Sequence, residues 1–325
     1  MLVPMDLPLD RAALESCLAP FGSATALPSR ACTSPEVFAW EQEHLFPLSW
    51  TCLGRAGVHR RAPGEREMGG WRFVQADPSG PSFEEQFGNL FELLAPWESE
   101  RLVVGARHSY EIRANWKLIH ENYQECYHCS EIHPALCKVS PPDSGYSLDI
   151  HGMYVAGPMD LREGVETMSL DGRSYGIPLR GLDERQLHEV GYFGVWPNLL
   201  ISPHPDYVLT HRIEPLAADR VYIECEWLFP PELVERADFD PSYAVEFWDV
   251  TNKEDWKACE SLQRGVSSRG HRPGVFSTGW EAGVYLFTTM MVRSYLEGRP
   301  TGYEHVPGTA KIPRYELLAA QRGGG

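Results

Sequence analysis

The stretch from Asn115 to Pro134 contains carboxylate and histidine side chains at spacings that can hold a metal ion. Glu125 and His128 are three positions apart, so a helix would place them as neighbours on one face. His133 follows His128 by five positions, which turns its side chain by about 140° around a straight helix. Pro134 disfavours helical geometry at the residue before it, so we expect the helix to end near His133 and that imidazole to turn back. The pattern fits either a shared metal ion or two polar residues at a helix end.

A third candidate ligand lies on a predicted helix at 241–267. Asp255 falls on one face of this helix together with Trp248, Cys259, Leu262 and Val266. A carboxylate that faces a core must be paired, protonated or bound to a metal. Together with His128 and His133 it would form a set of two histidines and one carboxylate, which suits non-haem Fe(II) and leaves positions open for oxygen or substrate. The alternative is an Asp255 bonded to a nearby tryptophan or backbone amide.

Charge and hydropathy exclude two classes of function. The net charge of −16 argues against nucleic acid as a partner, because phosphate binding requires clustered Lys and Arg. No apolar run approaches the roughly 20 residues of a membrane span, so we expect no membrane association. The N-terminal segment has no basic region typical of a secretory signal, and a cytoplasmic enzyme is expected.

The eight cysteines are irregularly spaced in a chain that is not small, so we expect reduced thiols rather than a disulfide framework. Cys126-Tyr127-His128 has the C-x-H form of half a Rieske cluster site, but no C-x-x-H follows it. A cluster needs four correctly spaced ligands. Cys126 and Cys129 are therefore expected to be small helix residues.

The surrounding elements follow from periodicity and turn residues. Residues 1–33 are expected to be irregular, and 58–68 to form a loop. Helices are predicted at 35–45, 82–95, 241–267 and 280–297. Strands are predicted at 50–54, 70–76, 102–113, 147–155, 191–202, 207–214 and 220–229. Short turns between the later strands imply an antiparallel sheet. Glu254 and Glu260 fall on other faces of their helix and are expected to be solvated.

The motifs taken together resemble a known family. The relevant segments are Asn115-Trp116-Lys117, Glu121-Asn122-Tyr123, Glu125-Cys126-Tyr127-His128, His133-Pro134, Tyr192-Phe193-Gly194, His211-Arg212-Ile213-Glu214 and Asn252-Lys253-Glu254-Asp255-Trp256. They resemble the catalytic-domain signature of Rieske non-haem iron oxygenase α-subunits, in the branch that contains glycine betaine and choline monooxygenases. The resemblance runs nearly continuously over residues 101–295. Residues 33–50 also match the family's lead-in helix.

The resemblance implies a fold and a site. The fold would be α+β, a helix-grip (START/Bet v1-like) antiparallel sheet wrapped on a long C-terminal helix. His128, His133 and Asp255 would be the iron ligands. Glu125 would match the acid that links the iron to a Rieske cluster in a neighbouring subunit. Glu125 and Asn122 are therefore candidate catalytic residues.

Two departures from the family pattern stand out. Members carry a Rieske domain before the strand that begins at Gly70, whereas here Arg55 leads to Met68 through a short loop. We therefore expect no [2Fe–2S] cluster in this chain, with residues 1–69 as the lead-in helix and junction and 70–325 as the iron domain. His120 stands where an apolar residue is expected, and it is either a packed residue or an added proton-transfer group, hence a further catalytic candidate.

The expected function is that of a non-haem iron oxygenase-type oxidoreductase acting on a small organic molecule. Electrons would come from a separate iron–sulfur protein or from the substrate itself. The alternatives are a redox-neutral metal-dependent hydrolase or lyase, with Glu125 or His120 as base, and a non-catalytic small-molecule binding module. Candidate pocket residues are Phe193, Trp196 and Phe287. A homo-oligomer is left open.

Overall fold

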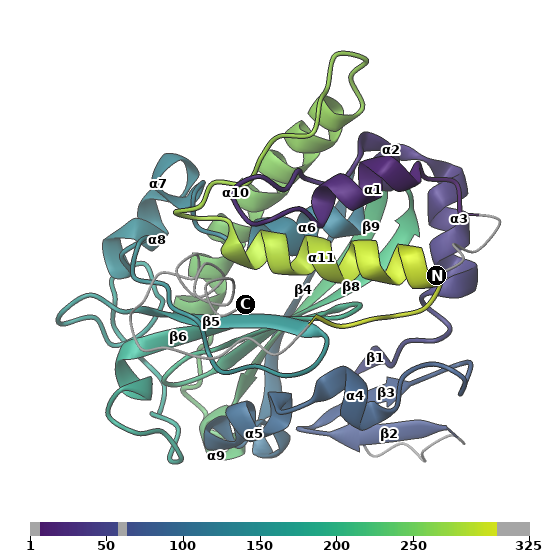
Figure 1. Ribbon diagram of the computed structural model, residues 1–325. Helices are drawn as coiled ribbons and strands as arrows, with labels where there is room; N and C mark the ends of the chain where they lie inside the picture. Colours follow the sequence, from purple (N-terminus) through teal and green to yellow (C-terminus); the bar gives the residue numbers. More distant parts are fainter. Residues whose placement is uncertain (1–6, 58–63, 304–325) are drawn as a thin grey trace.

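A six-stranded antiparallel sheet forms the centre of the molecule. The computed structural model describes residues 7–57 and 64–303 (Figure 1). Strand order in the sheet is β4-β9-β8-β7-β6-β5. The strands are β4 (Val103–Ile112), β5 (Tyr154–Asp160), β6 (Glu189–Val195), β7 (Leu199–Pro203), β8 (Val208–Ala217) and β9 (Arg220–Phe229). β5 to β9 pair with their sequence neighbours because short turns join most of them.

A second, three-stranded sheet lies beside the first. Its order is β1-β3-β2, with β1 (Thr51–Arg55), β2 (Glu65–Met68) and β3 (Trp71–Val74). Asn198, in the turn between β6 and β7, connects the small sheet to the large sheet through hydrogen bonds. The Asn198 side chain accepts a hydrogen bond from the Cys52 N–H at 2.9 Å and donates one to the Cys52 carbonyl at 3.0 Å.

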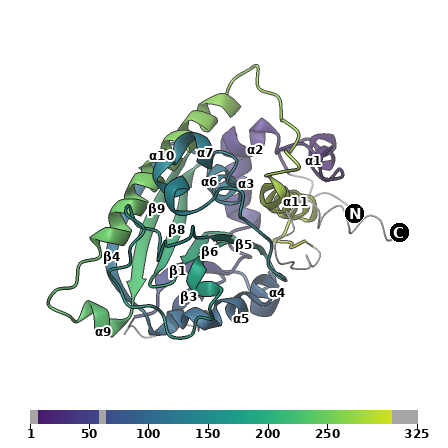
Figure 2. The same cartoon turned by 90° about the vertical axis from the view of Figure 1, so that its left-hand side faces the viewer.

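Helices pack on one face of the large sheet and at its end. In Figures 1 and 2 the long helices α10 and α11 lie over the sheet with α6 beside them. α10 and α11 both contact α6. The helices are α1 (Arg11–Cys17), α2 (Ser29–Thr33), α3 (Pro35–His44), α4 (Phe83–Phe87), α5 (Leu90–Leu94), α6 (Trp116–Tyr123), α7 (Cys129–Ile132), α8 (Pro134–Val139), α9 (Pro231–Val234), α10 (Ser242–Val266) and α11 (Ala282–Glu297). The expected α+β class, with an antiparallel sheet on long helices, is confirmed.

Several element boundaries differ from those predicted. The strand predicted at 191–202 is a hairpin, β6 and β7, because Pro197 cannot donate to a ladder and lies in the turn. The helix predicted at 82–95 breaks at Gly88, where the chain has a positive φ of 47°. A Cβ there would lie 1.9 Å from the His151 carbonyl oxygen, so the close approach requires glycine.

The N-terminal region is the largest disagreement. Residues 11–17 and 29–33 are helical, so the expectation of an irregular segment at 1–33 is wrong. The Asp10 carboxylate caps α1 by accepting from the Ala12 N–H at 3.1 Å, and Leu14 and Cys17 are buried. Burial of this apolar face stabilises a helix too short to be marked by its periodicity.

Part of the loop predicted at 58–68 is strand β2, and residues 58–63 lie outside the described residues. The division at 69/70 stays a prediction; β2 and β3, on either side of it, belong to one sheet. In the described part of the chain, no helix is long and apolar enough to cross a bilayer.

Candidate metal centre

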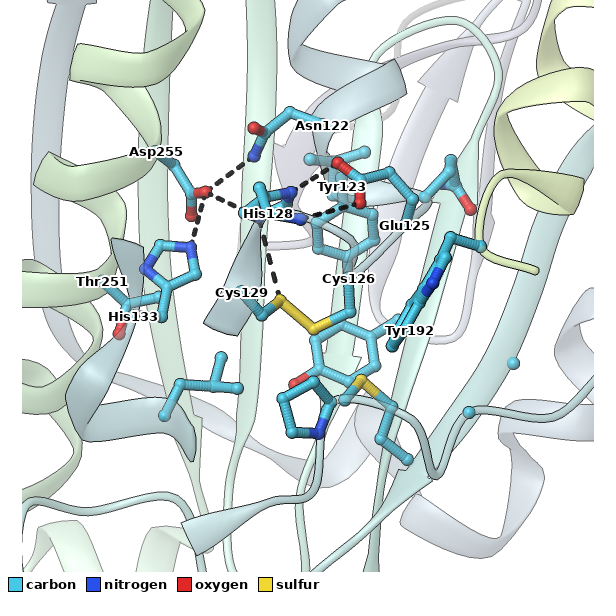
Figure 3. Close-up of a pocket in the computed structure, with 18 of the residues that line it drawn as sticks. Asn122, Tyr123, Glu125, Cys126, His128, Cys129, His133, Tyr192, Thr251 and Asp255 are labelled. Atoms are coloured by element: carbon cyan, nitrogen blue, oxygen red, sulfur yellow. Dashed lines mark hydrogen bonds and ion pairs between the residues drawn. A yellow bond between two sulfur atoms is a disulfide. The ribbon is translucent and has the colours of Figure 1, made fainter. Parts of the chain in front are cut away.

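His128, His133 and Asp255 converge in the structure. One ligand atom from each lies within 4.8 Å of the others. The carboxylate atom Oδ1 of Asp255 is 2.9 Å from Nε2 of His133 and 3.4 Å from Nε2 of His128 (Figure 3). Both imidazoles therefore turn the same nitrogen towards the shared carboxylate, as a common metal ion would require.

A second carboxylate contacts each imidazole at Nδ1, the nitrogen that points away from Asp255. Nδ1 of His128 donates to Glu125, and Nδ1 of His133 donates to Glu254 at 2.8 Å. Such outer carboxylates fix the ring orientation and raise the basicity of the inner nitrogen. Asn122 holds the third ligand, because its Nδ2 donates to Asp255 Oδ1 at 2.7 Å. The donor set and its supports fit a mononuclear two-histidine, one-carboxylate iron site.

The charges of the site are strongly coupled. Burial alone would lower the pKa of His128, but the hydrogen bonds that its ring donates to Asp255 and Glu125 outweigh burial and raise that pKa to about 10. The pKa of His133 is also raised, since its bonds to Asp255 and Glu254 outweigh burial. Burial would raise the pKa of Asp255, yet its bonds to the two histidines hold it well below its usual range. The carboxylate therefore stays ionised and able to bind a cation.

The local fold of the histidine segment differs from the continuous helix predicted. α6 ends at Tyr123, and residues 124–128 form a turn before α7. The Glu125 carboxylate accepts the backbone N–H of Tyr127 and, at 3.3 Å, that of His128. These bonds compete with helix continuation, which is why Glu125 and His128 meet across a turn. The predicted break at His133 is confirmed, with φ −114° and ψ 67° immediately before Pro134.

α10 carries the third candidate ligand, Asp255, as predicted. The residues predicted to share its helix face are not all buried, however. Trp248, Cys259 and Val266 are buried, whereas Leu262 is 47% exposed. The expectation that Glu254 is solvated is wrong, since it bonds to His133. The sequence signal for Glu254 was its position directly before Asp255 in the segment that resembles the family. Glu260 accepts the backbone N–H of Arg113 at 3.1 Å.

The three residues line a cavity of about 370 Å³. Its wall also includes Asn122, Tyr123, Glu125, Cys126, Cys129, Tyr192, His211, Trp248, Asn252, Trp256 and Trp280. The aromatic wall residues therefore come from α6, α10, the sheet and, for Trp280, the segment before α11. The predicted candidates Phe193, Trp196 and Phe287 are buried core residues outside this wall. Residue type alone does not tell on which side of an element a side chain lies.

His120 lies away from the cavity wall. Its side chain is fully buried and stacks on Phe287 with ring centroids 5.0 Å apart. Nε2–H donates to the Pro197 carbonyl at 3.0 Å, and burial lowers the pKa of His120 to about 4. This setting is that of a packed helix residue, and we propose no catalytic role for it.

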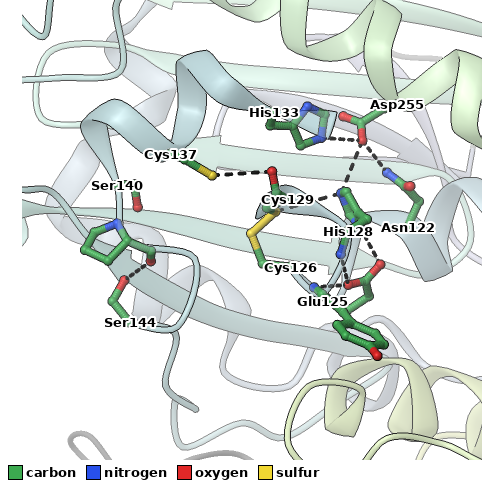
Figure 4. The surroundings of a disulfide bond; sticks show 12 residues. Asn122, Glu125, Cys126, His128, Cys129, His133, Cys137, Ser140, Ser144 and Asp255 are labelled. Atoms are coloured by element: carbon green, nitrogen blue, oxygen red, sulfur yellow. Dashed lines mark hydrogen bonds and ion pairs between the residues drawn. A yellow bond between two sulfur atoms is a disulfide. The ribbon is translucent and has the colours of Figure 1, made fainter. Parts of the chain in front are cut away.

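Cys126 and Cys129 form a disulfide within the cavity wall (Figure 4). The expectation of reduced thiols is wrong for this pair, and so is the expectation that both are ordinary helix residues. The turn after α6 brings their Cα atoms to 4.9 Å, a separation that a disulfide can span. The other six cysteines are free.

Comparison with known proteins places these residues in a family. Residues 99–297 match the model of the ring hydroxylating alpha subunit, catalytic domain. The glycine betaine monooxygenase oxygenase subunit of Chromohalobacter salexigens is 28% identical over 264 residues, which is 71% of this chain and 58% of the relative. The carnitine monooxygenase oxygenase subunit of Escherichia coli K12 is 30% identical over 210 residues, 63% of this chain and 52% of the relative. The chain thus spans less than two thirds of these relatives' length.

Solved structures share the fold. A quaternary ammonium Rieske monooxygenase superimposes with a TM-score of 0.72 at 19% identity, over 91% of this chain and 100% of the other. A naphthalene 1,2-dioxygenase gives 0.62 at 12% identity, over 93% and 96%. The family model matches more than half of the chain, residues 99–297, and the chain belongs to the ring hydroxylating alpha subunit catalytic-domain family.

Proposed function

We propose that this chain is the catalytic unit of a mononuclear non-haem iron monooxygenase acting on a small quaternary ammonium compound. The observation that carries the proposal is the set of His128, His133 and Asp255, which opens into the cavity with its outer contacts in place. The relatives' names support the substrate class, since they are subunits of glycine betaine and carnitine monooxygenases.

The cavity wall suits a cation with a polar group. Trp248, Trp256 and Tyr192 present aromatic rings, which attract quaternary ammonium ions. In the described part of the chain, the buried Tyr192 hydroxyl and Nδ1 of His211 have no hydrogen-bond partner. Tyr192 can donate to a substrate carboxylate. Nδ1 of His211 can accept from a hydroxyl, because its Nε2–H donates to Asn252 and burial lowers its pKa to about 4.

The residues around the ligands would orient the ligand side chains and would not react with the substrate. Fe(II) held by the three ligands would supply dioxygen activation at a position open to substrate. Glu125 and Glu254 hold the two imidazoles in register, and Asn122 holds the carboxylate. Among the predicted catalytic residues, Glu125 and Asn122 thus act as positioning residues in this proposal.

The electron source is part of the proposal. The printed sequence contains no paired C-x-H and C-x-x-H motifs, so we infer that this chain carries no [2Fe–2S] cluster. Reducing equivalents would come from a separate iron–sulfur protein or from the substrate. Glu125 lies beside His128 with part of its side chain exposed, and in this proposal a separate donor would deliver its electrons there.

Oxygen uptake tests the function. The protein is loaded anaerobically with Fe(II) and given glycine betaine or carnitine, with and without a ferredoxin–reductase pair, in thiol-free buffer. Uptake coupled to demethylated or hydroxylated product supports the proposal, and the need for the pair identifies the electron source. Substrate turnover without oxygen consumption would instead indicate redox-neutral chemistry. Absence of any turnover of both substrates, with the pair and also with dithiothreitol as the reductant, would contradict the proposal.

Metal analysis tests the ligands separately. Asp255→Asn removes the ionised carboxylate and should lose most of the bound iron, because two imidazoles alone bind Fe(II) weakly. Glu246→Gln, on an exposed face of α10, is the matched control and should retain iron. Equal iron content in both variants would remove Asp255 from the site.

A further inference from the structure

The disulfide between Cys126 and Cys129 lies directly against the candidate metal centre. Sγ of Cys129 is 3.9 Å from Nε2 of His128, the nitrogen that faces Asp255 (Figures 3 and 4). No residue stands between this sulfur and the ligand nitrogen, since the two atoms are in van der Waals contact. Glu125 contacts the same imidazole on its other nitrogen. The histidine therefore has Glu125 at Nδ1, and Asp255 together with the sulfur pair at Nε2.

Cys126 is also partly accessible, unlike most cysteines of this chain. Cys126 is half-buried and Cys129 is buried, and both line the cavity. Of the six free cysteines, five are buried and only Cys137 is half-buried. Cys-x-x-Cys is the spacing found in many redox-active dithiols, which form and break their disulfide without a change of fold.

We propose that the Cys126–Cys129 dithiol is an internal electron donor for oxygen activation at the metal centre, and that the disulfide is its spent form. This inference rests on the proposed function. It assigns a source for the electrons that relatives with a Rieske cluster would take from that cluster.

The reaction balances with the dithiol as co-substrate. A substrate C–H bond and dioxygen's O–O bond break, while a C–O bond and the sulfur–sulfur bond form. One oxygen atom enters the product; the other leaves as water with the two thiol protons. Dioxygen takes up one electron pair from the C–H bond and one from the two thiols. An external dithiol then restores the pair by thiol–disulfide exchange, with Cys126 as the more exposed sulfur for attack.

A single-turnover experiment follows the sulfur atoms directly. The protein is reduced anaerobically with dithiothreitol, freed of it, loaded with Fe(II) and mixed with glycine betaine. After a pulse of oxygen the free thiols are alkylated. The mass of the peptide that contains both cysteines is then measured by mass spectrometry. We expect about one new Cys126–Cys129 disulfide for each product molecule. Disulfide formation should be at least several-fold slower without iron or without substrate.

Two variants make the readout specific. Cys126→Ser/Cys129→Ser should keep its iron but form no product when dithiothreitol is the only reductant. Cys137→Ser is the control, because its side chain donates to the Cys129 carbonyl at 3.3 Å and a serine hydroxyl can do the same. This control should match the wild type in product and in disulfide formed.

The outcomes separate this inference from the proposed function. Product formed with the ferredoxin–reductase pair while Cys126 and Cys129 stay reduced, and none with dithiothreitol, would overturn the inference and leave the function standing. Disulfide formation at the same rate without iron would also overturn it, as plain air oxidation. Failure of both electron sources with glycine betaine and carnitine would remove the function, and this inference with it.

Discussion

At the scale of single residues, the site is built from pairs in which one side chain orients another. His133 shows this most clearly, with Asp255 on one nitrogen and Glu254 on the other. A metal ion would replace the proton between His133 and Asp255, whereas the bond to Glu254 would persist. Glu254 should therefore affect metal affinity without being a ligand.

Glu254→Gln tests this role. An amide is a weaker acceptor than a carboxylate, so metal affinity should fall by roughly 10–100-fold. Anaerobic titration with Co(II), followed by its visible absorption, measures the change. Glu246→Gln serves as the control for charge on α10. Equal affinities in the two variants would show that Glu254 does not support His133.

Glu121 gives a pH dependence that is independent of the metal ligands. Burial raises its pKa from 4.5 to about 7, partly offset by Lys117. The folded protein then binds more protons than the unfolded chain between these values, so stability falls as pH rises through that window.

Metal-free wild type should therefore lose roughly 2–3 kcal/mol more unfolding free energy from pH 5 to pH 8 than Glu121→Gln. Urea unfolding at the two pH values measures this difference, and other titrating groups cancel in the comparison. Parallel pH profiles for the two proteins would rule out an elevated pKa at Glu121.

At the scale of elements, a buried carboxylate holds three helices together. Glu41 on α3 accepts from Lys117 Nζ at 2.6 Å and from Trp116 Nε1 at 3.0 Å, both on α6. The Tyr295 hydroxyl on α11 also donates to it. Glu41 and Lys117 are fully buried. This contact fixes α6, which carries Asn122 and Tyr123 into the cavity wall.

Lys117→Met should destabilise the fold by about 3–5 kcal/mol, because it leaves the Glu41 charge buried without a countercharge. The double variant Glu41→Gln/Lys117→Met should recover much of this loss. Denaturant unfolding of the single and double variants measures both effects. A single variant as stable as the wild type would contradict a stabilising role for the contact between Glu41 and Lys117.

At the scale of the whole molecule, the small sheet bears on the question of the cluster. β1 and β2 flank residues 56–64, and the family resemblance of the sequence predicts a Rieske domain at this point in family members. β1 pairs with β3 and is tied to the large sheet through Asn198. The flanking strands are thus joined into the same fold as the iron domain.

The 325-residue chain, reconstituted with Fe(II) and sulfide, should therefore bind about one iron and no acid-labile sulfide. Iron and sulfide assays measure this, together with the visible spectrum. The Asp255→Asn variant, treated in the same way, should bind neither iron nor sulfide. Stoichiometric sulfide, or the absorption of a [2Fe–2S] centre, would contradict the absence of a cluster in this chain.

The sequence by itself identified the candidate ligand set and determined the fold class. Asp255 was identifiable because a carboxylate on an apolar helix face needs a partner, and His133 because Pro134 ends the helix before it. The alternation and turn residues of the later strands indicated the antiparallel sheet, since these signals are local.

Only the tertiary structure decided the contacts between distant segments. Glu254 was expected to be solvated because its helix face was judged from α10 alone, whereas His133 approaches from another part of the chain. Cys126 and Cys129 join because the Glu125 carboxylate takes up backbone donors and turns the chain after α6. Phe193 and Tyr192 are adjacent, yet only Tyr192 lines the cavity, because successive strand residues face opposite sides of the sheet. Which side is the cavity depends on the helices that cover it, and no local pattern contains that information.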